Sequence, residues 1–347
     1  MFKGISSHAL MVKPIPTLKT QTDAIVRMKM TTICGTDLHI MKGSVKTVTD
    51  GRILGHEGVG IITEIGNDVS NHRVGDQVLI SCITSCGKCP NCSRGFYAHC
   101  KTGGWLLGNT IDGCQAEYVR IPHADGSLHS LSLQTPQSKL ESYVMMSDIL
   151  PTGLEVGVID GQVQANKRLA IVGAGPVGLA CVATAKSFNP LEILMIDRDA
   201  HRLKIALELG ATHAFDNTHN QAVDSIMKHT NGEGVDVVIE AIGTPSGWDM
   251  CENIVSSGGN IAILGVHGKP VTLHLDRMWY RNFTLTAGLV HTSTIPEIKK
   301  RVDKGELNPE KLISHHFGLT EIERAYDVFT NAARHNALKV IIKNDYC

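Results

Sequence analysis

The sequence predicts an α/β protein with two domains: a first domain rich in β-strands and a second domain built on a doubly wound parallel sheet. The chain has 347 residues, 42% of them hydrophobic, which at about 150 residues per domain is enough for two hydrophobic cores. Before Pro151, short apolar runs are separated by Gly, Asn and Asp turns, whereas after it predicted strands and helices alternate. Such alternation is typical of a parallel sheet covered by helices.

The β-type runs of the first domain are short and bounded by turn residues. They predict strands at residues 24–28, 59–65, 77–81 and 116–121. The end of the chain has a mixed pattern, which predicts helices at 295–304 and 319–334 and a last strand at 339–342. We expect this last part to pack on the first domain.

The second domain alternates between apolar runs and helical segments. The apolar runs predict strands at residues 168–172, 192–196, 235–240 and 260–264. The segments between them predict helices at residues 177–187, 200–209 and 248–255. Since parallel strands are joined by crossover helices, this order predicts one parallel sheet.

The charge balance is close to neutral, with Lys+Arg 33, Asp+Glu 34 and a formal net charge of -1. This balance provides no general attraction for nucleic acid or anionic membranes. The longest uncharged stretch, residues 169–185, contains glycines and a proline that suit a turn and not a membrane span. The apolar run at residues 9–12 is too short for a signal peptide. We therefore expect a cytoplasmic protein with no nucleic-acid partner and no membrane partner.

The second domain opens with an apolar strand that runs into a glycine-rich turn and then a helix. The turn has the spacing Gly-x-Gly-x-x-Gly, and its residues are Gly173, Gly175, Pro176, Val177 and Gly178. The first glycine makes the turn, the second lets backbone approach a pyrophosphate, and the third lets helix and strand pack closely. The start of the helix faces the phosphate charge. The sequence therefore predicts a Rossmann dinucleotide-binding domain, and the alternative is a set of glycines that only make tight turns.

An acidic residue, Asp197, follows the next predicted strand about twenty residues after the turn. Its carboxylate would accept hydrogen bonds from the hydroxyls of the adenosine ribose and repel a 2′-phosphate, which favours NAD over NADP. The neighbouring Arg198 argues in the opposite direction, because an arginine can bind that phosphate. We expect NAD as the preferred cofactor.

Four of the ten cysteines lie close together in the first domain. Cys86, Cys89, Cys92 and Cys100 have the spacing C-x2-C-x2-C-x7-C on a loop rich in Gly, Pro and Asn. Four thiolates can close a tetrahedral shell around zinc and leave no position for water, which predicts a structural site. The alternatives are an iron-sulfur cluster and thiols that bind no metal. A zinc ribbon for nucleic acid would need a basic face, and the nearby basic residues are only Lys88, Arg94 and Lys101.

A second metal-like cluster is dispersed along the first domain. It comprises Cys34, His56 in a Gly-His-Glu-Gly segment, and a carboxylate. One thiolate, one imidazole and one carboxylate leave a fourth position for water or substrate, as a catalytic zinc requires. The candidates for the carboxylate are Glu57, Asp148 and Glu155.

These motifs occur together in an order that covers almost the whole chain: CGTDLH at 34–39, GHEGVG at 55–60, the four cysteines, DGCQAEY at 112–118, SDILPTG at 147–153, GAGPVG at 173–178 and Asp197. In this combination the sequence resembles the zinc-containing medium-chain alcohol dehydrogenases. The segment SDILPTG resembles the bacterial secondary-alcohol dehydrogenases, in which an aspartate is the third zinc ligand. Well-known NADP-dependent members of that branch lack an acid at the position of Asp197. Some of them have also lost the cysteines that correspond to Cys86, Cys89, Cys92 and Cys100, the lobe cysteines. This chain keeps both features.

The resemblance implies roles for particular residues. The implied ligands of a catalytic zinc are Cys34, His56 and Asp148, with Glu57 behind the metal or as an exchangeable ligand. Thr36 would hydrogen-bond the alcohol, and His39 would end a proton relay through the ribose of the cofactor. Thr152 is expected beside the cofactor. Trp105 and Leu289 are candidates for the substrate pocket or the nicotinamide site, or for core packing.

The resemblance also implies an architecture and an activity. Residues 1–152 with 290–347 would form a GroES-like catalytic domain, and residues 153–289 the Rossmann domain. The expected protein holds NAD and two zinc ions per chain, one catalytic and one structural. It would transfer hydride between NAD and a secondary alcohol, whose oxidised partner is a ketone, with primary alcohols and aldehydes as further substrates. A polyol, butanediol or threonine dehydrogenase and an inactive nucleotide-binding relative are the alternatives, and a homotetramer or dimer is the expected assembly.

Overall fold

A computed structural model describes residues 1–4 and 7–344. The chain divides into two compact units, the first comprising Met1–Asp148 with His291–Cys347 and the second Ile149–Val290. The boundaries expected from the sequence are 152/153 and 289/290. Ile5, Ser6 and residues 345–347, which the sequence assigns to the first domain, lie outside the described residues.

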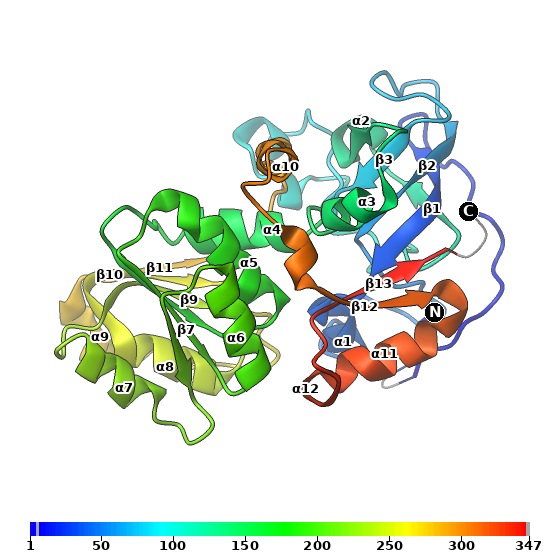
Figure 1. Cartoon of the computed structure of the whole chain (residues 1–347). Coiled ribbons are helices and arrows are strands. Elements are labelled where there is room, and N and C mark those ends of the chain that lie inside the picture. The colour runs from blue at the N-terminus through cyan, green and yellow to red at the C-terminus, as the bar shows by residue number, and fades with distance from the viewer. Residues whose placement is uncertain (5–6, 345–347) are drawn as a thin grey trace. The chain divides into compact units, whose positions relative to one another are not determined.

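The sheet of the first unit joins strands from both ends of the chain (Figure 1). Its strands follow the order β12-β13-β1-β2-β3-β5, and β4 pairs with β1. Their bounds are β1 Ala24–Thr32, β2 Gly58–Ile65, β3 Gln77–Ile80, β4 Tyr118–Ile121, β5 Leu128–Leu131, β12 Ile313–Gly318 and β13 Lys339–Lys343. Strand β13 is antiparallel to β1, with Met30 opposite Lys343. The last part of the chain therefore completes the sheet that the first part begins.

The helices of the first unit are short: α1 Gly35–Met41, α2 Ala124–Ser127, α3 Gln137–Val144, α10 Ile295–Asp303, α11 Ile322–Thr330 and α12 Ala332–His335. The single helix predicted at 319–334 is wrong, because a 3-10 turn, Leu319–Glu321, precedes α11 and Asn331 separates α11 from α12. The Asn331 side chain donates to the Asp327 carbonyl and carboxylate at 3.0 Å. An asparagine that bonds back to the preceding turn competes with helical hydrogen bonds and ends α11.

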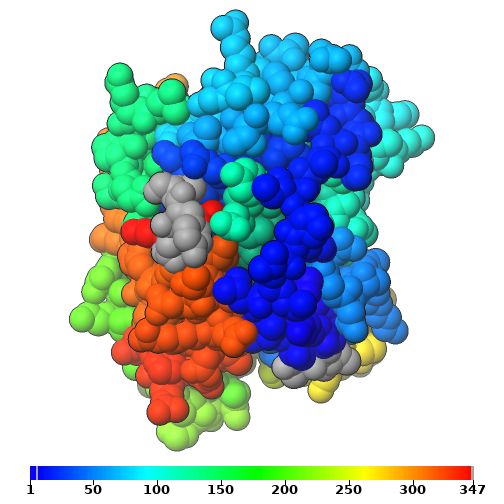
Figure 2. All heavy atoms as spheres, turned by 90° about the vertical axis from the view of Figure 1, so that its right-hand side faces the viewer, coloured from blue at the N-terminus to red at the C-terminus, as the bar shows by residue number. Residues whose placement is uncertain are grey.

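Two apolar clusters stabilise the described part of the first unit. The inner faces of the strands contribute one cluster, which includes Val26, Met28, Ile62, Ile80 and Val119. Helices α1 and α11 pack on the C-terminal strands in the other, which includes Ile40, Phe317, Tyr326 and Ile342. The N-terminal segment, dark blue in Figure 2, runs along the surface of this unit, where the Leu10 amide donates to Glu323 Oε1 at 3.4 Å.

The second unit is a six-stranded parallel sheet in the order β11-β10-β9-β6-β7-β8. The strands are β6 Arg168–Val172, β7 Glu192–Asp197, β8 His213–Asp216, β9 Val235–Glu240, β10 Val255–Ile263 and β11 Thr284–Ala287. Numbered along the chain, this is the 3-2-1-4-5-6 order of a Rossmann fold, with its switch point between β6 and β9. The predicted fold class is therefore confirmed.

The helices of the second unit are α4 Ile149–Thr152, a π-helix Gly153–Ile159, α5 Pro176–Ala185, α6 Ala200–Leu209, α7 Ala222–His229, α8 Pro245–Ile254 and α9 Leu275–Met278. Helix α8 begins earlier than predicted because the Thr244 hydroxyl accepts a hydrogen bond from Gly247 N and Pro245 occupies the first turn. Among the described residues, no helix combines the length and the hydropathy needed to cross a lipid bilayer.

Candidate metal centres and nucleotide site

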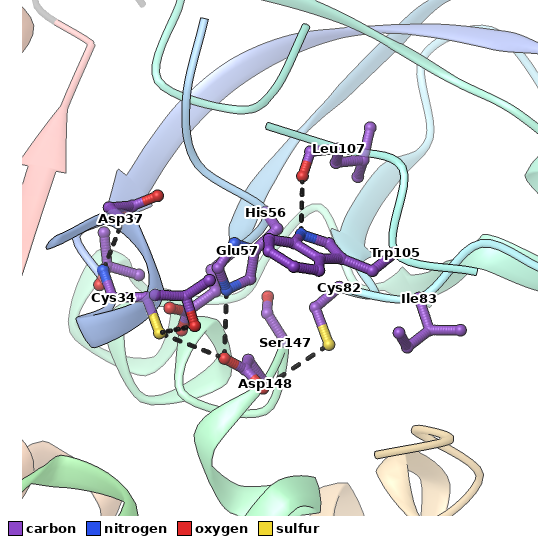
Figure 3. Close-up of polar contacts among 12 residues, drawn as sticks. Cys34, Asp37, His56, Glu57, Cys82, Ile83, Trp105, Leu107, Ser147 and Asp148 are labelled. Atoms are coloured by element: carbon purple, nitrogen blue, oxygen red, sulfur yellow. Dashed lines mark hydrogen bonds and ion pairs between the residues drawn. The ribbon is translucent and has the colours of Figure 1, made fainter. Parts of the chain in front are cut away.

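Four candidate metal ligands of the first unit converge at one place. The ligand atoms of Cys34, His56, Glu57 and Asp148 all lie within 4.8 Å of one another. His56 Nε2 is 3.2 Å and Cys34 Sγ 3.5 Å from the same carboxylate oxygen, Asp148 Oδ2 (Figure 3). Asp148 is 9% exposed and the other three are more deeply buried. The first unit thus brings together the dispersed residues that the sequence nominated, and Glu155 lies on the π-helix of the other unit.

Backbone hydrogen bonds hold these side chains in place. Cys34 is the residue before α1, and its amide donates to Asp37 Oδ2 at 3.0 Å. His56 and Glu57 immediately precede β2, where the Thr31 hydroxyl donates to the Glu57 carbonyl at 2.7 Å. The Gly58 amide donates to Ser147 Oγ at 3.1 Å, which ties the start of β2 to the residue before Asp148.

The chemistry of the donors fits a divalent zinc ion. Burial raises the pKa of the Cys34 thiol, and the Asp148 charge raises it further. Burial would lower the pKa of His56, but its hydrogen bonds with Asp148 and Cys34 outweigh burial and raise it well above the ordinary value. Among the described residues, the buried atoms His56 Nδ1 and Glu57 Oε2 have no hydrogen-bond partner. A thiolate, an imidazole and a carboxylate around one point are a donor set that zinc accepts.

Glu57 is held by a buried lysine that the sequence analysis did not single out. Lys339 Nζ lies 2.6 Å from Glu57 Oε1, and both side chains are 1% exposed. The same ammonium donates to the Ile33 carbonyl at 3.1 Å. Burial would lower the pKa of Lys339, but the Glu57 charge outweighs it, so the ammonium is kept. A lysine in the otherwise apolar start of β13 was the available signal for a buried charge pair.

The proposed relay residues share helix α1. Thr36 Oγ1 is 3.7 Å from Cys34 Sγ. His39 lies three residues further along, which places both side chains on the same side of the helix. Burial lowers the pKa of the half-buried His39, and Lys42 lowers it further. His39 is therefore a neutral base at neutral pH.

Two further side chains border the cluster. The Trp105 ring stands edge-on to the His56 ring at a centroid distance of 6.1 Å, and its Nε1 donates to the Leu107 carbonyl. Trp105 also packs on the core cluster of α1 and α11. The sequence analysis missed Cys82, whose sulfur lies 3.7 Å from Asp148 Oδ1 (Figure 3). Leu289, in the second unit, is 40% exposed and so does not belong to a core.

The four cysteines of the lobe also converge. The sulfurs of Cys86, Cys89, Cys92 and Cys100 lie within 4.8 Å of one another. Backbone amides of Cys92 and Lys101 bond to the Cys89 sulfur and lower the pKa of this thiol to about 6. Burial and neighbouring thiols raise the pKa of Cys92 to about 12. Without a cation the four groups cannot all be thiolates at neutral pH, whereas four thiolates in this arrangement fit the closed shell of a zinc ion.

The glycine-rich turn of the second unit has the stereochemistry of a dinucleotide loop. Gly173 has φ +107°, and a Cβ there would meet Ile242 at 2.7 Å. A Cβ on Gly178 would overlap the Gly173 carbonyl oxygen, so only glycine lets α5 start this close to β6. A Cβ on Gly175 would meet nothing within 4 Å. That open side is where the backbone can approach a phosphate.

A pocket of about 620 Å³ lies at the carboxyl ends of the strands of this unit. It is lined by Gly173, Gly175, Asp197 and Arg198, among the residues nominated from the sequence. Pro176, Val177, Gly178 and Thr152 do not line it. The lining residues that the sequence analysis missed include Asn217 and Asn220 on the loop after β8, Arg202 on α6, and Asp249 and Asn253 on α8.

Asp197 ends β7 and joins the glycine turn to the pocket. Its Oδ2 accepts a hydrogen bond from the Ala174 amide at 2.6 Å, and its Oδ1 accepts from the amides of Arg198 and Asp199. The Arg198 guanidinium bonds to Asn220 Oδ1 at 2.8 Å. The carboxylate thus sits at the edge of a pocket that holds the adenosine part of a dinucleotide in proteins of this fold.

Comparisons with known proteins agree with this geometry. Residues 20–131 match the family model "Alcohol dehydrogenase GroES-like domain", and residues 176–304 match "Zinc-binding dehydrogenase". An alcohol dehydrogenase of Cupriavidus necator is 34% identical over 95% of this chain and 94% of its own length. The chain belongs to the zinc-containing medium-chain alcohol dehydrogenase family. The family assignment predicted from the motifs is therefore confirmed.

Two further similar proteins add detail. The structure "Zinc dependent alcohol dehydrogenase 2 from Streptococcus pneumonia - apo form" has a TM-score of 0.93 and 47% identity, and covers 99% of this chain and 97% of that one. An "L-threonine 3-dehydrogenase" of Bacillus licheniformis is 28% identical over 91% of this chain and 90% of its own length. The chain is thus an alcohol-dehydrogenase-type oxidoreductase.

Proposed function

We propose that this protein is an NAD-dependent zinc alcohol dehydrogenase that interconverts secondary alcohols and ketones. The observation that carries the proposal is the convergence of Cys34, His56 and Asp148 on one buried point. One thiolate, one imidazole and one carboxylate make three ligands, and a zinc ion with three protein ligands has a position open to substrate. Glu57, held by its ion pair with Lys339, would lie beside the bound metal.

The chain's own groups supply the proton path. When bound, zinc acts as a Lewis acid toward the oxygen of the substrate. The Thr36 hydroxyl, beside Cys34, accepts the proton of the substrate hydroxyl and donates its own onward. His39, a neutral imidazole on the same side of α1, accepts that proton and releases it to solvent. The Asp37 carboxylate positions this turn, because its Oδ2 accepts hydrogen bonds from Cys34 N and Gln115 Nε2.

NAD is the proposed hydride acceptor. The Asp197 carboxylate at the edge of the pocket accepts hydrogen bonds from ribose hydroxyls and repels a 2′-phosphate. Arg198 and Arg202 also line this pocket and would attract such a phosphate, but each has an acceptor close by: Asn220 for Arg198, and Asp199 at 3.8 Å for Arg202. The balance of these charges favours NAD.

A second candidate is a dehydrogenase of an amino alcohol or polyol. Its support is the likeness to the L-threonine 3-dehydrogenase of Bacillus licheniformis, which spans nearly the whole of both chains. Such an enzyme would use the same metal ligands with a different substrate pocket. An inactive relative would be expected to lack part of the ligand set or relay, and this chain retains Cys34, His56, Asp148, Thr36 and His39.

The deciding experiment combines metal content with a substrate panel. Purified protein is analysed by mass spectrometry for zinc, and NADH or NADPH formation is followed with propan-2-ol, butan-2-ol, butane-2,3-diol and L-threonine. About two zinc ions per chain and fastest turnover of a simple secondary alcohol with NAD support the proposal. Fastest turnover of L-threonine or the diol favours the second candidate. No turnover of any substrate, with zinc bound and NAD binding intact, contradicts both.

The proposal extends to assembly and compartment. Strand β11 is an edge of the parallel sheet, and large apolar side chains near it are exposed, among them Leu275, Trp279, Tyr280 and Leu285. An edge strand with apolar neighbours suits pairing with a second copy, and we propose a homotetramer or dimer. The lobe cysteines must be thiolates to hold a metal, which a reducing compartment favours, so the proposed location is the cytoplasm.

A further inference from the structure

A third group of potential metal ligands lies in the second unit, apart from the two clusters described above. Ligand atoms of Glu192, His213 and His229 lie within 4.8 Å of one another. His229 Nε2 is 3.1 Å from Glu192 Oε2, and the two imidazole rings are 4.6 Å apart between centroids. The Phe215 ring covers one side of the group, with its centroid 5.9 Å from that of His229. Both histidines are exposed and Glu192 is half-buried.

The fold places these three residues together by register. Strands β7 and β8 are parallel, and Leu194 is paired with His213. Because side chains alternate along a strand, Glu192 lies on the same face of the sheet as Leu194 and its partner His213. Helix α7 packs on this face through Ile226 and ends at His229. The three ligands therefore come from two strands and one helix that the core already holds in place.

This group is remote from the nucleotide pocket. Glu192 is the first residue of β7 and Asp197, which lines the pocket, is the last. At about 3.3 Å per residue, these two positions are about 16 Å apart along the strand. The group lies at the amino ends of the strands, whereas the pocket lies at their carboxyl ends, so a ligand here would not compete with the cofactor.

We propose that Glu192, His213 and His229 form a binding site for a divalent transition-metal ion. Two imidazoles and one carboxylate are ligands of intermediate softness, which select ions such as Ni²⁺, Cu²⁺ and Zn²⁺ over Mg²⁺ and Ca²⁺. The remaining coordination positions face solvent and take water. A bound ion would join β7, β8 and α7 and stabilise the second unit by binding the folded state alone.

One neighbouring charge sets a limit on the affinity. Arg168 Nε lies 3.4 Å from Glu192 Oε2, and Arg168 Nη1 lies 3.5 Å from Glu233 Oε2. The arginine thus competes with a metal ion for Glu192. Glu233 can keep its ion pair with the Arg168 guanidinium when Glu192 binds the metal ion. Breaking the Arg168–Glu192 pair lowers the affinity for the metal but does not prevent binding.

The test uses the full-length protein with its resident metals and nickel chloride as the probe. Wild type and three variants, His213→Gln, His229→Gln and Glu192→Gln, are dialysed to equilibrium against micromolar Ni²⁺, and bound nickel is counted by mass spectrometry. We expect wild type to hold one more nickel ion per chain than each variant. Nickel that enters the thiolate sites adds equally to all four proteins. Equal nickel in wild type and His213→Gln would overturn the proposal.

Matched variants separate metal binding from folding. His219→Gln removes another exposed histidine of the same unit that is outside the cluster, and it should bind nickel like wild type. Circular dichroism and the melting temperature without nickel check that each variant is folded. His213 is the most informative position, since it is exposed at the start of β8. Nickel should raise the melting temperature of wild type and His219→Gln but not of His213→Gln, and an equal rise in all three would also overturn the proposal.

Discussion

Lys339 of β13 and Glu57, beside the candidate metal ligands, form an ion pair of 2.6 Å in which both side chains are 1% exposed. The two residues are separated by 282 positions in the chain. The pair therefore links the C-terminal segment to the candidate metal centre within the first unit. A carboxylate buried behind a metal needs a compensating charge when the metal is absent, and Lys339 supplies it.

Removing only the lysine should destabilise the first unit strongly. In the metal-free protein, Lys339→Met leaves Glu57 as an uncompensated buried charge, a change that costs about 3–5 kcal/mol. The free energy of unfolding from a urea titration measures the loss. Lys343→Met is the matched control, because Lys343 on the same strand pairs with Glu141 at 2.7 Å near the surface, where such pairs contribute about 0–1 kcal/mol. A similar loss of unfolding free energy in the two variants would show that the buried pair stabilises the protein no more than the surface pair does.

The candidate ligands of the catalytic metal should be indispensable for turnover but not for nucleotide binding. Cys34→Ser and His56→Ala each remove a donor from the buried cluster, and loss of Lewis-acid stabilisation of about 4 kcal/mol corresponds to about a thousandfold lower kcat. NAD binding, measured by fluorescence titration, should remain. Cys114→Ala serves as the control, since this buried thiol lies outside both metal clusters. Full activity in Cys34→Ser would refute the assignment.

The cysteine lobe should govern metal content and stability more than chemistry. Cys89→Ser removes the thiol whose lowered pKa of about 6 makes it a ready metal ligand. We expect the variant to lose about one zinc ion per chain and to melt at a lower temperature, while the folded fraction keeps its KM for alcohol. Zinc analysis and thermal unfolding test this, with Cys181→Ala, a buried thiol of the second unit, as control. Unchanged zinc content in Cys89→Ser would contradict the structural site.

Asp197 should determine the choice between NAD and NADP. Asp197→Gly removes the carboxylate from the edge of the pocket while Arg198 and Arg202 remain. The ratio of kcat/KM for NAD to that for NADP should fall by about tenfold or more, since one lost repulsion of about 1.4 kcal/mol corresponds to that factor. Asp216→Asn changes an exposed carboxylate at the end of β8 that does not line the pocket, and it should leave the ratio unchanged. A ratio that stays constant in Asp197→Gly would exclude Asp197 from cofactor selection.

The sequence predicts the elements of this fold that depend on a local pattern of apolar residues. Strands β6 and β9 and helix α6 have the expected bounds, because their apolar periodicity is local. Strand β8 was missed, since its residues His213 to Asp216 are only partly buried and show no apolar run. The Glu57–Lys339 pair and the Asp148–Cys82 contact were missed for another reason. They join residues far apart in the chain. Contacts between such residues depend on the order of the strands in the sheet, and this order cannot be predicted from a local sequence pattern.

Asp23 provides a test of how the first unit responds to acid. Burial would raise the pKa of this carboxyl, but hydrogen bonds from the Thr20 hydroxyl, from the Lys19 and Thr20 amides and from Arg120 outweigh it and hold the pKa below its usual value of 3.8. A carboxyl with a lowered pKa in the folded state stabilises the protein above its unfolded-state pKa, and this contribution is lost as pH falls through the folded-state pKa. Asp23→Asn should therefore lower the free energy of unfolding at pH 7 by about 2 kcal/mol. The gap between wild type and variant should close as the pH falls below 3.8. Urea titrations across this pH range measure the gap, with the exposed Asp68→Asn as control. A gap that stays constant down to the acid limit would mean that the charge of Asp23 does not stabilise the fold.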